Sequence, residues 1–594
     1  MLVASVGIDK KFQDAVKNHQ RGDVNEAKRL YQEVLEQNSS HVQSLCNLSI
    51  IYKLEKEYNK AQKSLELAIS LEPTNIIALN NLANLYRERR DFEKAIEIGI
   101  KITSLHPNDA SSFNNLAITY ESFGDFEKAF KTYQKAIKID EKFIKAYNNI
   151  GVLLYKQNRY IQAISVFELA LKQDLEDVQT LCNLGASYNK AKRYIDAQKV
   201  LEKAITIDIN SSGAYVNLGN VYNKLNRHMD ALACHNEALK HDSNSASNWA
   251  NIAITYKHLE QYEKAISSFD RALSIDKNFV NAHFDLATTH LLLGYYEKGF
   301  SEYEWRFKKP QMQALLNDHS YIFKKPKFEK NSETKDKTLL LFSEQGFGDI
   351  IQFIRFVELL KQKYSELKLK VHCRSELKTL LENSDFIDEV VSRDEEVGEF
   401  DYHLSIMSLP HFLEITLETL PTNTPYLKTD QKALRLYLSK KRLNIGIVWG
   451  ASNTGESYDD KVFSLEWFKP LMESDNIKLY SLQVGEDAKE IEMLGYSEDM
   501  IVDLQDNLSD FEITASVVEE LDLVISSDTS VAHLCGALGV EVWVLLQKGA
   551  DWRWGLESQT TPWYESTRLF RQSKKGDWES VFKDVTKALE MRKK

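Results

Sequence analysis

The sequence predicts an all-α repeat superhelix followed by an α/β region with two doubly wound halves. A 34-residue period fills the first half of the 594-residue chain, and apolar strand-like runs alternate with helical segments in the second half. Glycine (23) and proline (9) are scarce, which favours long helices over a loop-rich all-β fold. The formal net charge of −12 argues against general binding to nucleic acid or to an anionic membrane, since both prefer a basic face.

The repeat is marked by two residue types. Alanine recurs every 34 residues from Ala27 to Ala265, and tyrosine holds one phase in most units between Tyr52 and Tyr256. Each unit predicts two amphipathic helices joined by a short polar turn. This pattern resembles the tetratricopeptide repeat over about nine units, residues 8–307. The resemblance implies a right-handed superhelix whose concave face binds peptide.

An asparagine column follows the same period on the first helix of each unit. A side-chain amide offers two donors and an acceptor, so a row of amides can pair with an extended peptide backbone. The alternative is that these amides bond neighbouring repeats to one another. The row is similar to the asparagine ladder of O-GlcNAc transferases, which implies that an acceptor polypeptide binds here. The column is Asn47, Asn81, Asn115, Asn149, Asn183, Asn217 and Asn251.

Beyond residue 307 the period ends and strand-like runs begin. Apolar runs that alternate with helices predict buried parallel strands, in two halves that face each other across a ligand-binding cleft. The expected strands are 338–343, 369–373, 387–391, 401–406, 443–449, 478–484, 500–504, 521–526 and 541–546. The expected domains are the superhelix (1–307), a linker or docking segment (308–336), an N-terminal half (337–430), a C-terminal half (431–575) and a C-terminal helix (576–594).

The loop after the first expected strand, Ser343–Asp349, contains the first candidate site. Gly346 and Gly348, on either side of Phe347, permit a tight turn and the close approach of a substrate. The loop lacks the dinucleotide glycine pattern and the Walker lysine. Asp349 begins the helix expected from about residue 350 to 364, where it is either a general base facing the cleft or an N-cap. Glu344 is a rival base on the same loop.

The second candidate site opens a helix that starts near Val531. Asp528, Thr529 and Ser530 supply hydroxyls and free backbone N–H groups at the helix N-terminus, which suits a diphosphate and needs no metal. The alternative is ordinary helix capping by these residues. His533 either reaches the phosphates or packs within the helix.

Two further segments belong at the same sheet edge. Lys461 follows the strand expected at 443–449 and can neutralise a phosphate, although an isolated lysine is more often solvated. Gln483 and Glu486 end the next strand. Because carboxyl ends of parallel strands meet at one edge, we expect these side chains beside the helix that starts near Val531.

Residues 337–560 resemble the ADP-heptose:lipopolysaccharide heptosyltransferase family, glycosyltransferase family nine. The resemblance rests on Gly348-Asp349, on Asp528-Thr-Ser-Val-Ala-His533 and on Ala537-Leu-Gly539. It implies a GT-B fold in which Asp349 is the base, Asp528 contacts the donor sugar, and the residues after Asp528 hold the nucleotide diphosphate. Lys461 and Glu486 match donor contacts more loosely, and the family usually has glycine where Ser530 stands.

The tripeptide Trp552-Arg553-Trp554 resembles the tail of this domain when it is fused to tetratricopeptide repeats. The combined architecture is similar to that of O-GlcNAc transferases and bacterial flagellin glycosyltransferases. It implies an inverting, metal-independent enzyme without a cofactor, which transfers a sugar from a nucleotide-sugar to Ser or Thr of a bound protein, with flagellin as the leading acceptor.

Two alternatives remain open: a non-catalytic peptide-binding scaffold, and a transferase that acts on lipopolysaccharide or another glycan. The sequence shows no signal peptide and no apolar run of about 18 residues, so we expect a cytoplasmic protein without a membrane span.

Overall fold

The computed structural model describes residues 2–430, 438–451 and 461–592. These residues form two compact units, Met1–Leu259 and Glu260–Lys594. The predicted boundary between the two α/β halves, at 430/431, falls at the edge of residues outside the described ranges.

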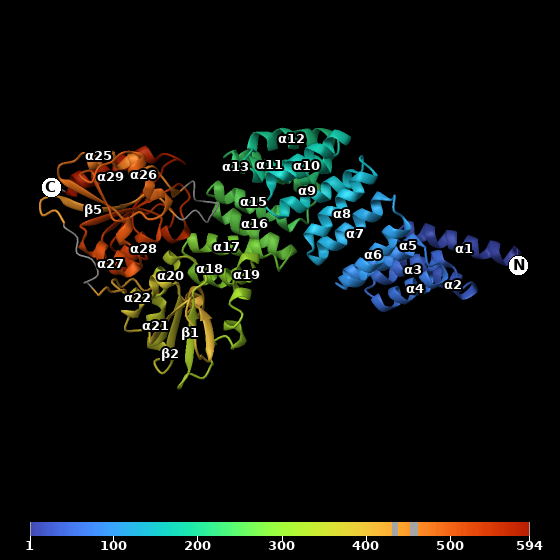
Figure 1. Ribbon diagram of the computed structural model, residues 1–594, viewed down its shortest axis with the longest axis horizontal. Coiled ribbons are helices and arrows are strands. Elements are labelled where there is room, and N and C mark those ends of the chain that lie inside the picture. Colours follow the sequence, from blue (N-terminus) through green and yellow to red (C-terminus); the bar gives the residue numbers. More distant parts are fainter. Residues whose placement is uncertain (1, 431–437, 452–460, 593–594) are drawn as a thin grey trace. The chain divides into compact units, whose positions relative to one another are not determined.

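The first unit is a run of paired helices, drawn from blue to green in Figure 1. Helix pairs follow the 34-residue period, and the marker alanines Ala27, Ala61 and Ala95 are fully buried where the paired helices meet. The helices are α1 (Leu2–Gln20), α2 (Val24–Gln37), α3 (Val42–Leu54), α4 (Tyr58–Leu71), α5 (Ile76–Glu88), α6 (Phe92–Leu105), α7 (Ala110–Phe123), α8 (Phe126–Ile139), α9 (Ile144–Lys156), α10 (Tyr160–Gln173), α11 (Val178–Lys190), α12 (Tyr194–Ile207), α13 (Ser212–Lys224), α14 (His228–His241) and α15 (Ala246–His258).

Each pair turns at a residue with a left-handed backbone. This conformation ends the first helix by breaking the run of α-helical hydrogen bonds. Glycine supplies it at Gly124 (φ 92°), whereas Lys56 and Arg90 adopt it at φ 61° and 60° without glycine's freedom. The turn therefore recurs through backbone geometry rather than through one residue type.

His235 occupies the fully buried core position that Phe167 and Phe269 fill in two other repeats. Neither imidazole nitrogen has a hydrogen-bond partner among the described residues. Burial lowers the pKa of His235 to about 4, below its ordinary value near 6.5, so the folded chain keeps this ring neutral.

His235→Phe is expected to remove an acid sensitivity of the first unit. Between pH 6.5 and 4 the unfolded imidazole binds a proton that the folded one excludes, so stability falls as the pH falls through this window. The protonation of unfolded His235 lowers the unfolding free energy at pH 5 by about 2 kcal/mol relative to neutral pH. Chemical unfolding at pH 7.5 and pH 5 measures it, and an equal loss of stability in wild type and variant would contradict the prediction.

The second unit begins with the last repeat helices, α16 (Tyr262–Ile275), α17 (Val280–Leu292) and α18 (Tyr296–Tyr303). The repeat pattern thus runs to Tyr303, near the predicted end at 307, but the compact unit begins at Glu260. The expected linker contains α19 (Pro310–Asp318), and Lys327 pairs with His403 beside the first sheet. Segment 308–336 thus contains a helix and pairs with the first sheet at one point, and its role as linker or docking segment stays a prediction.

Both sheets of the second unit are parallel throughout. The first sheet has the order β3-β2-β1-β4 and the second β10-β9-β8-β5-β6-β7. In each sheet the chain adds strands first on one side of the first strand (β1 or β5) and then on its other side, as in doubly wound sheets. The strands are β1 (Thr338–Phe342), β2 (Lys368–Cys373), β3 (Glu389–Ser392), β4 (Tyr402–Ser405), β5 (Leu443–Val448), β6 (Ile477–Ser481), β7 (Ile501–Asp503), β8 (Leu523–Ser527), β9 (Val542–Leu546) and β10 (Thr567–Arg571). Nine of these ten follow the predicted runs, and β10 was not predicted.

Helices flank both sheets (Figure 1). The helix expected at 350–364 is two helices, and the predicted C-terminal helix is present within the described residues. The helices are α20 (Phe347–Phe353), α21 (Arg355–Lys363), α22 (Ser375–Glu382), α23 (Leu409–Phe412), α25 (Lys469–Met472), α26 (Glu490–Met493), α27 (Phe511–Glu520), α28 (Ser530–Leu538) and α29 (Trp578–Arg592).

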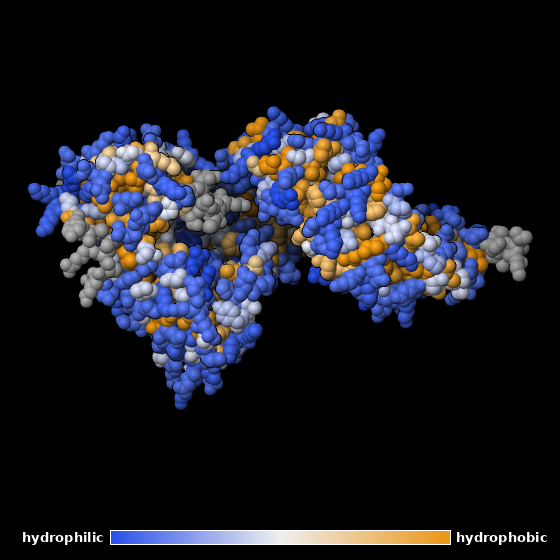
Figure 2. Space-filling model, in the orientation of Figure 1, coloured by the Kyte–Doolittle hydropathy of each residue, from blue (hydrophilic) through white to orange (hydrophobic). Residues whose placement is uncertain are grey.

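The face of the second unit seen in Figure 2 is mostly hydrophilic. Within the described ranges, no helix combines the length and the apolar character that crossing a bilayer requires.

Candidate functional site

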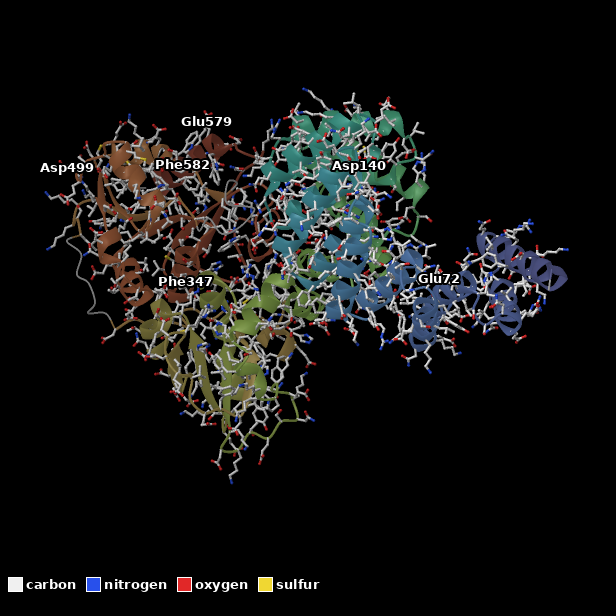
Figure 3. All side chains as sticks on the ribbon, turned by 45° about the vertical axis from the view of Figure 1, so that its right-hand side comes forward. Glu72, Asp140, Phe347, Asp499, Glu579 and Phe582 are labelled. Carbon is white, nitrogen blue, oxygen red and sulfur yellow. The ribbon has the colours of Figure 1, made fainter. Side chains whose placement is uncertain are left out.

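A cavity of about 530 Å³ lies between the two sheets of the second unit. Phe347, at the start of α20, contributes one wall, and Figure 3 shows its label where the two sheet-containing halves meet. The opposite wall comes from the segments that follow β6 and β8. Five of the predicted donor-site residues line it: Gln483, Glu486, Thr529, Ser530 and Val531.

The start of α28 gives this wall its electrostatic character. Strand β8 is fully buried and ends at Ser527, and the chain turns at Asp528 before α28 begins at Ser530. Thr529 holds the N-cap position, but its hydroxyl pairs with that of Ser526 at 2.9 Å instead of capping the helix. The first N–H groups of α28 thus lack a side-chain cap at the cavity wall, which suits an anionic group.

Asp528 is nearly buried beside this helix start, with a side chain 6% exposed. Its carboxylate forms an ion pair with Lys461 Nζ at 2.7 Å and accepts a hydrogen bond from Trp554 Nε1 at 2.8 Å. Burial alone would raise the pKa of Asp528, but Lys461 outweighs it and lowers the pKa, so the carboxylate stays ionised. Lys461, for which neutralisation of a phosphate and simple solvation were the two predicted roles, pairs with Asp528 in the structure.

His533 packs within the protein, the second of its two expected roles. Its ring stacks on Trp554 at 5.1 Å between centroids, and Nδ1 lies 2.9 Å from the Tyr564 hydroxyl. Burial lowers the pKa of His533 to about 3, so the ring is neutral and contributes no charge to an anion site.

Asp349 lies at the third position of α20, so the predicted N-cap role is wrong: Gly346 is the N-cap. One carboxylate oxygen accepts the Gly346 N–H at 3.1 Å, and the other pairs with the Arg553 guanidinium. The side chain remains 23% exposed. Burial raises the pKa of Asp349 against the opposing effect of Arg553, and the negative charge of Asp551 raises it further.

Glu344, like Asp349, is not among the residues that line the cavity. Its fully buried carboxylate pairs with Arg306 at 2.8 Å and accepts the Ser405 hydroxyl at 2.5 Å. The rival role of Glu344 as a base stays a prediction. Its carboxylate is fully buried, whereas the Asp349 side chain keeps 23% exposure, which favours Asp349.

The remaining predicted donor residues differ in their freedom. The Gln483 side-chain oxygen accepts the backbone N–H groups of Trp449 and Gly450 at 3.2 and 2.8 Å, so it fixes the end of β5. Glu486 is 88% exposed and pairs with Lys489 at 2.8 Å. Of these two residues, Glu486 is the one whose side chain can bind a ligand without breaking a buried contact.

Two groups at the site were not predicted from the sequence. Arg553 and Trp554, in the 3-10 turn η7 (Trp552–Trp554), contact Asp349 and Asp528 respectively. Phe511, at the start of α27, lines the cavity and lies 4.9 Å from Phe347 between ring centroids. The tryptophan-arginine-tryptophan tripeptide was visible in the sequence, but no spacing rule connects it to either aspartate.

Gly348→Ala is expected to destabilise the contact between the two halves. A Cβ at Gly348 would lie 2.8 Å from His533 Cδ2, and the His533 ring is fixed by Trp554 and Tyr564. We expect a loss of about 1–3 kcal/mol in unfolding free energy. Gly346→Ala is the matched control, because its Cβ would meet Asp349 Oδ2 at an ordinary 3.4 Å. Thermal unfolding with equal losses in both variants would contradict the prediction.

The asparagine column is half-buried, and part of it ties repeats together. Asn149 donates to Asn114 Oδ1 at 2.8 Å, Asn183 to Asn148 Oδ1 at 3.4 Å, and Asn217 to the Cys182 carbonyl at 3.3 Å. Asn47 donates to the Tyr31 hydroxyl at 3.1 Å. These four amides therefore bond to the preceding repeat, as the alternative interpretation proposed, and each keeps a second N–H.

Comparison with known families identifies the repeats. Tetratricopeptide repeat families match residues 42–75, 74–142, 144–177, 178–209 and 211–278. The chain thus carries tetratricopeptide repeats across most of its helical part.

Individual proteins give more distant matches. Protein FlbA of Caulobacter vibrioides is 23% identical over 284 residues, which cover 43% of this chain and 47% of that protein. The chain therefore spans about half the length of this curated relative. A tetratricopeptide repeat protein from Parabacteroides merdae is 19% identical with a TM-score of 0.36, covering 42% of this chain and 98% of that one. The Cut9-Hcn1 hetero-tetramer structure matches at 17% identity and a TM-score of 0.35, covering 49% and 59%.

Proposed function

We propose that the chain is a protein O-glycosyltransferase that moves a sugar from a nucleotide-sugar to Ser or Thr of a polypeptide bound by the repeats. The observation that carries the proposal is the cavity between two parallel sheets, with the α28 N-terminus in one wall and two aspartates beside it. Open parallel sheets bind ligands at this edge.

The cavity suits a nucleotide diphosphate. Its volume of about 530 Å³ lies within the range of small-molecule sites. Phe347 and Phe511 provide aromatic surface that suits a nucleotide base, and the uncapped N–H groups at the start of α28 suit a diphosphate. The Glu486 and Asp487 carboxylates in the same wall accept hydrogen bonds, which suits sugar hydroxyls.

The proposed reaction is a single displacement. The acceptor hydroxyl oxygen attacks the anomeric carbon, the bond from that carbon to the diphosphate oxygen breaks, and the diphosphate leaves with the electron pair. Asp349 takes the hydroxyl proton, and a raised pKa favours that role near neutral pH. The α28 N-terminus stabilises the charge on the departing diphosphate without a metal. The anomeric configuration inverts.

The repeats supply the acceptor side of the proposal. Tetratricopeptide repeats form peptide- and protein-binding scaffolds, and a polypeptide is the acceptor that gives this part of the chain a use. Flagellin is the acceptor that we propose to examine first. We also propose that the transfer takes place in the cytoplasm.

Two measurements test the proposal. A candidate acceptor co-expressed with this protein should gain the mass of one or more glycosyl groups on Ser or Thr, and should lack it when expressed alone. A panel of nucleotides and nucleotide-sugars should include one that raises the melting temperature of the full chain. If no acceptor gains mass and no nucleotide raises the melting temperature, the transferase proposal fails. The peptide-binding scaffold would then be the function that the chain supports. A mass gain on a glycan would favour the lipopolysaccharide-type alternative.

A further inference from the structure

Both aspartates of the site are held by neighbouring residues of one short loop, Asp551–Trp554. The Arg553 guanidinium pairs with Asp349, which comes from the first sheet's half. Trp554 Nε1 donates to Asp528 at 2.8 Å, in the second sheet's half. A displacement of this loop would release both carboxylates together.

Arg553 is itself fixed from three directions. Its side chain is 9% exposed, and it bonds Asp551 at 2.8 Å and Gln352 Oε1 at 2.6 Å in addition to Asp349. Burial lowers the pKa of Arg553, but the carboxylates of Asp551 and Asp349 outweigh it, so the guanidinium stays charged. The orientation of Asp349 therefore depends on a cation with little freedom of its own.

The back of the loop packs against the last repeat. The Trp552 ring lies 6.0 Å from Phe300 and 6.5 Å from Tyr296, between centroids, and both partners belong to α18. It also meets Phe353 of α20 at 6.4 Å, edge to face. All four aromatic residues belong to one buried cluster that continues into both sheets. Helix α18 and the loop thus share a core within the second unit.

We infer that the loop Asp551–Trp554 is the positioning element of the site and that helix α18 supports it through Trp552. Arg553 and Trp554 are positioning residues: they set the geometry and the ionisation of Asp349 and Asp528. The inference rests on the proposed transferase function. It assigns the last repeat a part in the chemistry, because α18 packs against the loop that contacts both aspartates.

Trp554→Phe tests the donor-side contact. Phenylalanine keeps an aromatic face against His533, but it lacks the indole N–H that donates a hydrogen bond to Asp528. We expect kcat to fall about 10–100-fold while the donor KM changes less than about threefold, as for a misplaced reacting group. The matched control is Trp543→Phe, because Trp543 is also buried and donates its Nε1 to a carboxylate, Glu541, at 3.0 Å. Equal behaviour of the two variants would overturn the inference.

Arg553→Gln tests the acceptor-side contact by its pH dependence. Arg553 lowers the pKa of Asp349, so its removal should raise that pKa. The acidic limb of the kcat/KM profile should then move to higher pH, whereas a loss of folding alone would lower the whole curve. Arg553→Lys keeps the charge and should restore the position of the limb. A limb that stays in place in Arg553→Gln would overturn the role of Arg553.

Trp552→Leu tests the support from the last repeat. If Trp552 acts through the loop, its effect on kcat should not add to that of Trp554→Phe, and the double variant should resemble the more impaired single variant. Fully additive effects would overturn the coupling. Failure of the transferase proposal is distinguishable, because the wild-type chain would then transfer no sugar from any donor tested.

Discussion

Asp349→Asn is expected to abolish most sugar transfer while leaving nucleotide binding in place. The amide keeps the shape of the carboxylate and can still accept the Gly346 N–H at 3.1 Å, but it cannot take a proton from the acceptor hydroxyl. Loss of a positioned base lowers rates by about 10²–10⁴-fold. Single-turnover transfer, measured with saturating donor, reports this step directly.

The control for Asp349→Asn is Glu358→Gln, an exposed carboxylate on α21 in the same half. It should transfer sugar within about twofold of wild type, since surface substitutions seldom matter beyond such factors. The nucleotide-induced melting shift should persist in both variants. Full activity in Asp349→Asn would remove this residue as the base, and a lost melting shift would mean that the variant had damaged the donor site instead.

The second large effect is expected at the ion pair between Asp528 and Lys461. Asp528→Asn leaves Lys461 Nζ without its carboxylate partner at 2.7 Å, in a site where Lys461 is only 25% exposed. An unpaired, partly buried group of this kind costs about 1–3 kcal/mol of unfolding free energy. Because the family resemblance assigns Asp528 a contact with the donor sugar, the melting shift induced by a nucleotide-sugar should also shrink.

A double variant separates stability from function at this pair. Lys461→Met removes the orphaned charge, so Asp528→Asn combined with Lys461→Met should recover part of the stability lost in Asp528→Asn. Transfer activity should not recover, because the carboxylate is still missing. Recovery of both quantities would show that the pair only supports the fold.

Most of the fold was predictable because its signals are local and repeated. Alanines at a fixed spacing, such as Ala61 and Ala95, identify helix pairs without knowledge of their neighbours, and buried apolar runs such as 541–546 identify parallel strands. Strand β10 (Thr567–Arg571) was missed because its sequence, TRLFR, ends in arginine and alternates weakly. Its pairing with β9, rather than its own pattern, makes it a strand.

The candidate site was predicted less completely, because its geometry depends on partners distant in sequence. Asp349 and Arg553 are 204 residues apart, and Lys461 and Asp528 are 67 apart. A motif shows which residue types are present. It does not show that Glu344 forms a buried ion pair with Arg306, or that His533 hydrogen-bonds with Tyr564. The charged residues therefore found partners that no local spacing rule reveals.

The hydrogen bonds between asparagine side chains of successive repeats have a mechanical consequence for the first unit. Extension of the superhelix would lengthen contacts such as Asn149 to Asn114 and Asn183 to Asn148, which follow one another along the first helices of successive repeats. Each of these hydrogen bonds contributes about 1 kcal/mol, so they resist extension only modestly. We expect the superhelix to be easier to extend where the asparagine side chains are not paired.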